Sequence, residues 1–197
     1  MKPFYNSYTP LSDRDRLKTP LWLYRMLDNG YKFDIDLAAE DDRLHANYIT
    51  RKQNALNRYW PDCGKIGFLN PPYSDIAPWV NHAVHYARQG TFTTVMLIPT
   101  PNGELYYHKC LREAAKIIFI TGRINFMLPN GVTVTKGNNR GSCVFVFKEH
   151  VQQEFEVILR DYCWPLTIQF EKDETWRSRM IAELTPSQRK RFNVTSK

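Results

Sequence analysis

The chain has 197 residues, enough for one domain of usual size and short for two. It carries 27 Lys and Arg against 20 Asp and Glu, a formal charge of +7, which favours a polyanionic partner such as nucleic acid. No apolar stretch is long enough to span a membrane and the first residues do not resemble a signal peptide, so we expect a cytoplasmic protein. The four cysteines stand far apart, which predicts reduced thiols rather than a zinc or redox motif.

Helical and extended patterns alternate along the chain. The polar residues 1–18 predict a mobile arm, and Thr19 and Pro20 then predict the cap and first position of a helix that ends at Asn29-Gly30. Strands are predicted at residues 33–39, 64–69, 93–99, 116–121 and 142–147, and further helices at residues 77–90 and 103–115. This alternation predicts an α/β fold with a mainly parallel sheet and helices on both faces. For residues 151–197 we expect a helix followed by a basic tail.

The tetrapeptide Asn70-Pro71-Pro72-Tyr73 follows a predicted strand, and the carboxyl end of a strand is where open α/β sheets bind ligands. The Asn70 side-chain oxygen can accept a hydrogen bond from a planar amino group. Pro71 offers a carbonyl of fixed direction, and Tyr73 offers a stacking face. A planar amino group is a poor nucleophile, so a site that methylates it must hold it by hydrogen bonds and stacking. These residues suit that reaction. An ordinary turn is the alternative.

Several segments in a fixed order resemble the phage-type DNA N6-adenine methyltransferases (Dam). The set comprises Thr19-Pro20, residues 33–39, Asn54-Ala55-Leu56 with Trp60, residues 70–73 with Trp79, Leu97-Ile98-Pro99, and residues 122–126. The resemblance implies a Rossmann-like methyltransferase domain over residues 19–150. It also implies S-adenosylmethionine as the methyl donor and adenine in DNA as the acceptor, inside the host cell if a phage encodes the chain.

The resemblance also assigns expected roles to single residues. Thr19 and Pro20 match a cofactor-contacting segment, and Asp36 matches an acid beside the methionine part of the cofactor. Ala38 lies in the loop after that acid, and Asn54 matches a position near the cofactor's adenine. From the residues alone, Asp36 could instead be a solvent-facing strand residue and Asn54 a turn asparagine.

The loop after the predicted strand 33–39 has no glycine, which disfavours a cofactor that carries phosphate. S-adenosylmethionine has no phosphate and is cationic at sulfur, so a loop without glycine is compatible with its binding. The candidates for contact with its ribose are the acidic residues Glu40, Asp41 and Asp42, which could equally begin a solvated helix.

A basic surface for DNA is predicted between residues 105 and 141, with a solvated surface as the alternative. Its members are Lys109, Arg112, Arg123, Lys136 and Arg140. His82 and His85 lack a third ligand, so we predict no metal site.

Two other substrates would suit a similar loop, and a non-enzymatic nucleic-acid-binding module would explain the charge. A protein-glutamine N5 methyltransferase acts on another planar amide, and a cytosine-N4 methyltransferase on a similar amino group. Cytosine-N4 enzymes more often carry serine at the first position of the tetrapeptide, so Asn70 favours adenine.

Overall fold

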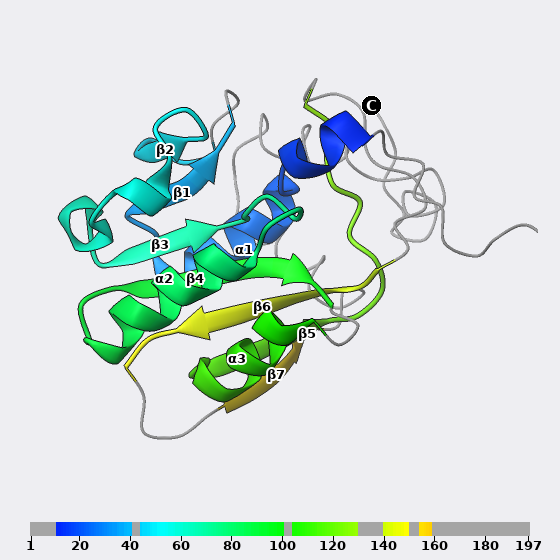
Figure 1. The fold of residues 1–197 in the computed structure, drawn as a ribbon. Coiled ribbons are helices and arrows are strands. Elements are labelled where there is room, and N and C mark those ends of the chain that lie inside the picture. The colour runs from blue at the N-terminus through cyan, green and yellow to red at the C-terminus, as the bar shows by residue number, and fades with distance from the viewer. Residues whose placement is uncertain (1–10, 41–43, 101–103, 130–139, 150–153, 159–197) are drawn as a thin grey trace, which may run out of the picture.

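The computed structural model describes residues 11–40, 44–100, 104–129, 140–149 and 154–158. Within these residues three α-helices, three 3-10 helices and a seven-stranded sheet form one α/β unit (Figure 1). In chain order the elements are η1 (Leu11–Arg16), α1 (Leu21–Tyr31), β1 (Ile35–Ala39), β2 (Tyr48–Thr50), η2 (Ala55–Asn57), η3 (Trp60–Cys63), β3 (Ile66–Leu69), α2 (Ala77–Arg88), β4 (Thr93–Pro99), α3 (Leu105–Glu113), β5 (Lys116–Ile120), β6 (Ser142–Phe147) and β7 (Glu154–Ile158). The predicted α/β class is confirmed.

The strand order is β2-β1-β3-β4-β6-β5-β7, and β6 alone runs antiparallel to its neighbours. The strands β1, β3 and β4 are parallel, so they end at one edge of the sheet, which we call the carboxyl edge. Because β6 starts opposite the end of β4, Ser142 pairs with Pro99 at this edge. The sheet is mixed, with four parallel pairings against two antiparallel ones, so the prediction of a mainly parallel sheet holds.

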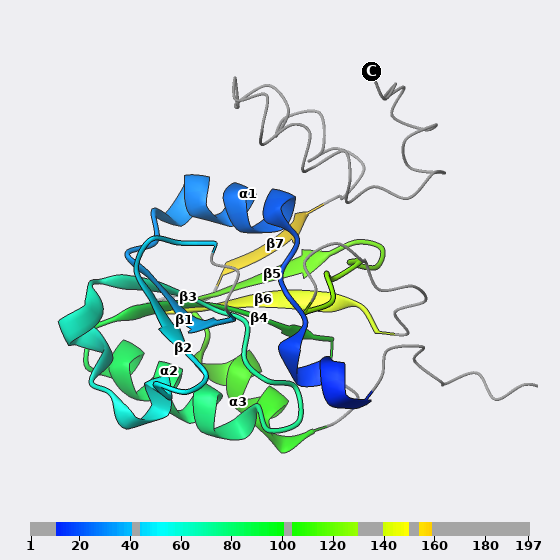
Figure 2. The ribbon, with the colours of Figure 1, turned by 90° about the horizontal axis from the view of Figure 1, so that it is seen from above.

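Helices cover both faces of the sheet, with α1 on one and α2 and α3 on the other (Figure 2). The near-helical spacing of Trp79, Val80, Ala83, Val84 and Ala87 explains the buried side of α2. The central strands β4 and β6 are continuous apolar runs because side chains on both of their faces are buried. In the described part of the chain, no helix has the length and apolarity needed to cross a membrane.

The start of α1 differs from the prediction. Pro20, not Thr19, is the N-cap residue, and no side chain bonds to the cap. Pro20 has an extended ψ of 137°, and its carbonyl accepts from the N–H groups of Leu23 and Tyr24, so the helix begins one residue later than expected. Thr19 is 3% exposed, which places it in the core rather than at a solvated helix end.

The end of α1 also differs, because the helix continues through Gly30 to Tyr31. Lys32 ends it in the left-handed conformation, at φ 58°, and its N–H bonds to the carbonyl of Asp28. The carboxylate of Asp28 then accepts from the N–H of Phe33 at 2.9 Å. The Asp28 side chain and carbonyl therefore hold the turn that was predicted at Asn29-Gly30.

Two expectations for the chain ends need correction. Residues 11–18 are folded rather than a mobile arm: Leu11–Arg16 form η1, and Lys18 pairs with Met127 in both backbone directions. Glu154–Ile158 form strand β7, beside β5, where a helix was expected. Residues 1–10 and 159–197 lie outside the described residues, and so does the predicted basic tail.

Candidate active site

A cavity of about 310 Å³ opens at the carboxyl edge of the sheet. Its lining comes from the segment before α1, the ends of β1 and β2, the turn at η2, the loop after β3, and α2. The lining residues are Asp15, Leu17, Leu37, Ala38, Glu40, Thr50, Arg51, Asn54, Ala55, Leu56, Asn70, Pro72, Asp75 and Trp79. The lining mixes apolar and polar side chains, and small-molecule sites combine an apolar surface with polar groups that orient the ligand.

The edge of β1 that faces the cavity is shaped by a β-bulge. Asp36 pairs with Tyr48 and Ala39 with Thr50, so three steps along β1 match two along β2. The backbone N–H of Ala38 donates to the Asp36 carboxylate at 3.1 Å. Bulges redirect neighbouring side chains and are frequent beside active sites. Here the bulge lies directly before the lining residue Glu40.

Asp36 itself is only 5% exposed, so the solvent-facing alternative is wrong for this residue. Burial raises the pKa of its carboxyl group to about 6, while the Ala38 N–H and the charge of His45 act in the opposite direction. The side chain is not among the residues that line the cavity, although Leu37 and Ala38 are. Its direct contact with a cofactor therefore stays a prediction.

Asp34 has a different and local partner. Its carboxylate accepts from the backbone N–H groups of Lys65 at 2.7 Å and Ile66 at 2.9 Å. These bonds attach the start of β3 to the start of β1. The residue is half-buried, and its carboxylate is occupied by these two bonds.

Asn70 presents the most informative hydrogen-bonding arrangement. Its Nδ2 donates to the carbonyl oxygen of Leu17 at 3.1 Å. A carbonyl can only accept, so this contact fixes which end of the amide is the oxygen. The Asn70 Oδ1 is buried and has no hydrogen-bond partner in the described part of the chain. Buried acceptors without partners are rare and costly, which makes this oxygen a candidate acceptor for a ligand.

The other residues of the tetrapeptide differ in whether they reach the cavity. Pro72 lines the cavity, whereas Pro71 is buried and Tyr73 does not reach the lining. The Tyr73 ring meets Phe126 edge to face, with centroids 6.0 Å apart and planes at 84°. Its hydroxyl is buried without a partner among the described residues. Burial, with a smaller contribution from Tyr106, raises the pKa of Tyr73 strongly. The stacking role of Tyr73 stays a prediction.

The charged lining of the cavity is mainly acidic. Asp15, Glu40 and Asp75 contribute three carboxylates against the one guanidinium of Arg51. The Arg16 Nε lies 3.3 Å from Glu40 Oε2 and partly neutralises it. Such a lining favours a ligand with positive charge.

The remaining predicted cofactor residues divide into two groups. Asn54 lines the cavity, and its Oδ1 accepts from the N–H of Leu56 at 3.2 Å, so it is a turn residue of η2 as well. Thr19 and Pro20 are buried and do not line the cavity.

Sequence reasoning did not identify several lining residues, namely Asp15, Leu17, Thr50, Arg51 and Asp75. They come from segments without a recognisable motif. Trp79, part of the set that resembles the family, is 8% exposed and also belongs to the lining.

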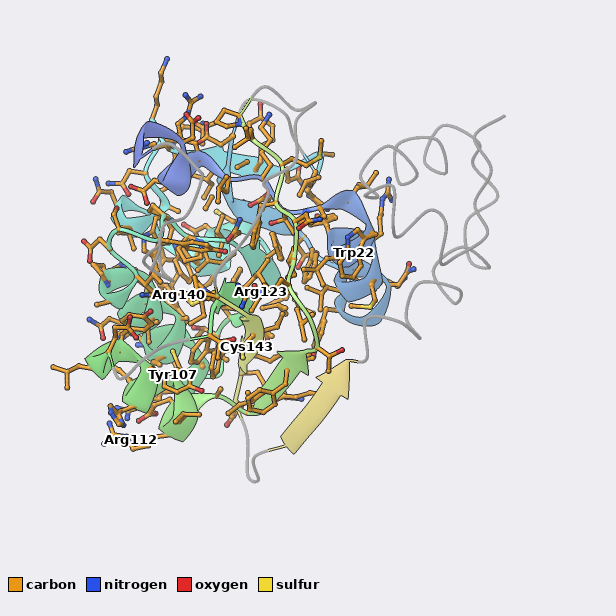
Figure 3. All side chains as sticks on the ribbon, turned by 90° about the vertical axis from the view of Figure 1, so that its right-hand side faces the viewer. Trp22, Tyr107, Arg112, Arg123, Arg140 and Cys143 are labelled. Carbon is orange, nitrogen blue, oxygen red and sulfur yellow. The ribbon has the colours of Figure 1, made fainter. Side chains whose placement is uncertain are left out.

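The predicted basic surface falls into separate parts. Arg123 follows the end of β5 and Arg140 precedes the start of β6, so both lie at the carboxyl edge, where Ile120 pairs with Ser142. Arg112 is in the last turn of α3, just before β5 begins, and therefore lies at the opposite edge. Figure 3 labels all three arginines and shows Arg112 at the lower left, apart from Arg123 and Arg140. Lys109 donates to Asn81 Oδ1 on α2 at 2.7 Å.

Two further predictions concern Lys136 and a metal site. Lys136, the fifth member of the basic surface, lies outside the described residues. Across the ranges that the structure describes, no group of three His, Cys, Asp or Glu side chains is arranged to hold a metal ion.

Comparison with known proteins identifies the family of this chain. The family described as DNA N-6-adenine-methyltransferase (Dam) matches residues 6–164. A DNA N-6-adenine-methyltransferase of Haemophilus phage HP1 (strain HP1c1) is 32% identical over 146 residues, covering 72% of this chain and 83% of the relative. A second, of Escherichia phage T1, is 28% identical over 176 residues, covering 79% and 73%. Because the family match extends over most of the chain, this protein belongs to the DNA N-6-adenine-methyltransferase (Dam) family.

Proposed function

We propose that this chain transfers a methyl group from S-adenosylmethionine to the N6 amino group of adenine in DNA, at the carboxyl edge of its sheet. The family and its phage relatives support the reaction. The observation that carries the residue assignment is the buried Asn70 Oδ1, an acceptor without a partner among the described residues, beside a cavity whose charged residues are mainly acidic. A planar amino group that donates hydrogen bonds is the complement of that oxygen.

The residues of the cavity fit the proposed cofactor. A volume of about 310 Å³ is at the lower end of the range for small-molecule sites. Leu37, Leu56 and Trp79 would contact its apolar parts, and the carboxylates of Glu40 and Asp75 would favour its positive charge. When bound, S-adenosylmethionine supplies a methyl group activated by the neighbouring sulfonium.

The chain's own residues then act on the acceptor base. Asn70 Oδ1 accepts a hydrogen bond from the adenine amino group, and the Pro71 carbonyl offers a second acceptor. These bonds pull the nitrogen toward tetrahedral geometry and localise its lone pair. The nitrogen would form its new bond to the methyl carbon while the bond from that carbon to the sulfonium breaks and leaves its electron pair on sulfur. The extra proton on the nitrogen would leave to water afterward, so no base is needed before attack. Fixed acceptors of this kind stabilise the transition state because they need no reorganisation.

The target adenine is not accessible inside a duplex, so we infer that it is extruded before reaction. Tyr73 would supply a ring for the extruded base. Arg123 and Arg140, which lie at the same edge as Asn70, would contact phosphates. The phage relatives support a reaction in the cytoplasm of a host cell.

Asn70→Ala tests the proposal. We expect kcat to fall by two to three orders of magnitude, about 3 kcal/mol in the barrier, because one preorganised acceptor is removed. Asn57→Ala is the matched control, since Asn57 is an exposed amide outside the cavity. Wild-type turnover by folded Asn70→Ala would contradict the assignment of the site.

The product identifies the substrate. Mass spectrometry of digested DNA should detect N6-methyladenine without N4-methylcytosine. A methylcytosine peak alone would show that the substrate is cytosine rather than adenine. Methylation of a release-factor protein but not of DNA would favour the glutamine enzyme.

A further inference from the structure

The segment just before α1 makes four contacts with distant parts of the chain, one from each of its consecutive residues 15–18. Asp15 Oδ1 accepts from the backbone N–H of Ser74 at 2.8 Å, and the Arg16 guanidinium pairs with Glu40. The Leu17 carbonyl accepts from Asn70 Nδ2, and Lys18 pairs with the backbone of Met127. Figure 2 shows this segment passing the edge of the sheet on its way to α1. None of these contacts is local in sequence.

Two of the four contacts hold the ends of the tetrapeptide loop. The Leu17 carbonyl fixes the amide of Asn70, at its first position, and Asp15 holds Ser74, one residue beyond its last position. Between these points the two prolines have restricted φ angles, so few backbone dihedral angles of the loop remain free to change. The turn over residues 72–75 is closed by a long backbone bond, from the Asp75 N–H to the Pro72 carbonyl at 3.4 Å. The bond from Asp15 is therefore the shorter restraint on this end of the loop.

We propose that Asp15 is a positioning residue for methyl transfer, acting as a hydrogen-bond acceptor that holds the Ser74 end of the loop so that Asn70 and Tyr73 keep their places. This proposal rests on the proposed function of the same loop. It assigns to residues 15–18 a structural part in the catalytic centre. A displacement of catalytic groups by about 1 Å can lower a rate by two orders of magnitude.

Asp15 also lines the cavity, so its carboxylate could instead act as a charge that attracts the cofactor. The two roles need different properties of the side chain. Holding Ser74 requires an oxygen acceptor at the position of Oδ1, with or without charge. Attracting a cation requires the negative charge, and the length of the side chain matters less.

Two variants separate these roles in the full chain. Asp15→Asn keeps an acceptor oxygen in place and loses the charge, whereas Asp15→Glu keeps the charge and moves the acceptor by one methylene. We expect the Glu variant to lower kcat about tenfold or more, with little change in the dissociation constant of S-adenosylmethionine. We expect the Asn variant to keep kcat within about threefold of wild type.

The measurements are kcat and KM on DNA, cofactor affinity by calorimetry, and thermal melting. Asp62→Ala, an exposed carboxylate in the remote helix η3, controls for a general loss of charge. A folded Asn variant with low kcat, or weakened cofactor binding in Asn but not in Glu, would overturn the proposal. So would an unchanged kcat in the Glu variant. The proposed function fails separately, if the wild-type chain does not methylate DNA or if Asn70→Ala is fully active.

Discussion

Asp36 is a buried carboxyl group, and its burial raises its pKa to about 6 from an ordinary value near 4. The folded protein therefore holds this proton more tightly than the unfolded chain does. This tighter proton binding contributes fully to the free energy of unfolding below the pKa that Asp36 has in the unfolded chain. The contribution is lost as the pH rises through the pKa that Asp36 has in the folded protein. The affected window runs from about pH 4 to pH 6.

Asp36→Asn removes this ionisation while keeping an oxygen that can accept from the Ala38 N–H. We expect the variant to gain stability relative to wild type as the pH rises from 4.5 to 7.5, by about 2 kcal/mol. Urea unfolding of both proteins at the two pH values measures the difference. A difference between the two proteins that does not change with pH would show that Asp36 titrates normally in the fold.

At the residue scale, the chemistry of a side chain can be inferred from the sequence more directly than its environment. The role of Asn70 as an acceptor stays a prediction from its amide, and the unpartnered Oδ1 supports it. The burial of Asp36 did not follow from the alternating pattern, because an acid at that position can face either solvent or α1. The partner that orients Asn70, the Leu17 carbonyl, lies 53 residues away and carries no side-chain signal.

Among the elements, the connection into β3 depends on a glycine. Gly64 has φ 139°, a value that side chains rarely adopt, and a Cβ there would collide with the side chain of Asp34. That side chain cannot move freely, because it holds the N–H groups of Lys65 and Ile66. The start of β3, and with it the loop at its other end, is thus fixed from the side of β1.

Gly64→Ala should lower the free energy of unfolding by about 2 kcal/mol, through backbone strain and the displaced Asp34. Gly30→Ala is the matched control: Gly30 lies inside α1, and a Cβ there would meet no atom within 4 Å. It should raise stability by about 0.5 to 1 kcal/mol, since alanine favours a helix. Denaturant unfolding of the two variants tests both signs. Equal effects would mean that Asp34 accommodates the new methyl group.

The limits of an element are predicted best where its apolar pattern is long. The strands 93–99 and 142–147 were predicted at their observed limits because their apolar runs are continuous. Strand β2 has only three residues, with one buried side chain, and gives no periodic signal. The end of α1 was misplaced because Gly30 looked like a terminator, whereas the Asp28 carboxylate and Lys32 form the actual turn.

At the scale of the whole molecule, the topology decides which distant segments meet. The ends of β1, β3 and β4 share one edge because these strands are parallel, so Ala38, Asn70 and Thr100 could be expected there. The folded state of residues 11–18 could not, since its bonds are made to residues 40, 70, 74 and 127. Mixed charge in an isolated segment looks the same whether or not such partners exist.

The same topology sorts the basic residues and gives the last prediction. Arg123 lies at the carboxyl edge with Asn70, whereas Arg112 lies at the opposite edge, next to the ion pair between Arg88 and Glu113. Both arginines are exposed, and their replacement by alanine removes the same charge. A duplex engaged at Asn70 would meet phosphates near Arg123 and not near Arg112.

We therefore expect Arg123→Ala to weaken DNA binding and to reduce the slope of log K against log salt by about one, the value for one lost phosphate contact. Arg112→Ala should leave the slope unchanged. Fluorescence anisotropy with a labelled duplex over a series of salt concentrations gives both values. Equal losses in the two variants would show that DNA is attracted by the overall positive charge, and a loss in Arg112→Ala alone would place the duplex on the opposite edge, away from the tetrapeptide loop.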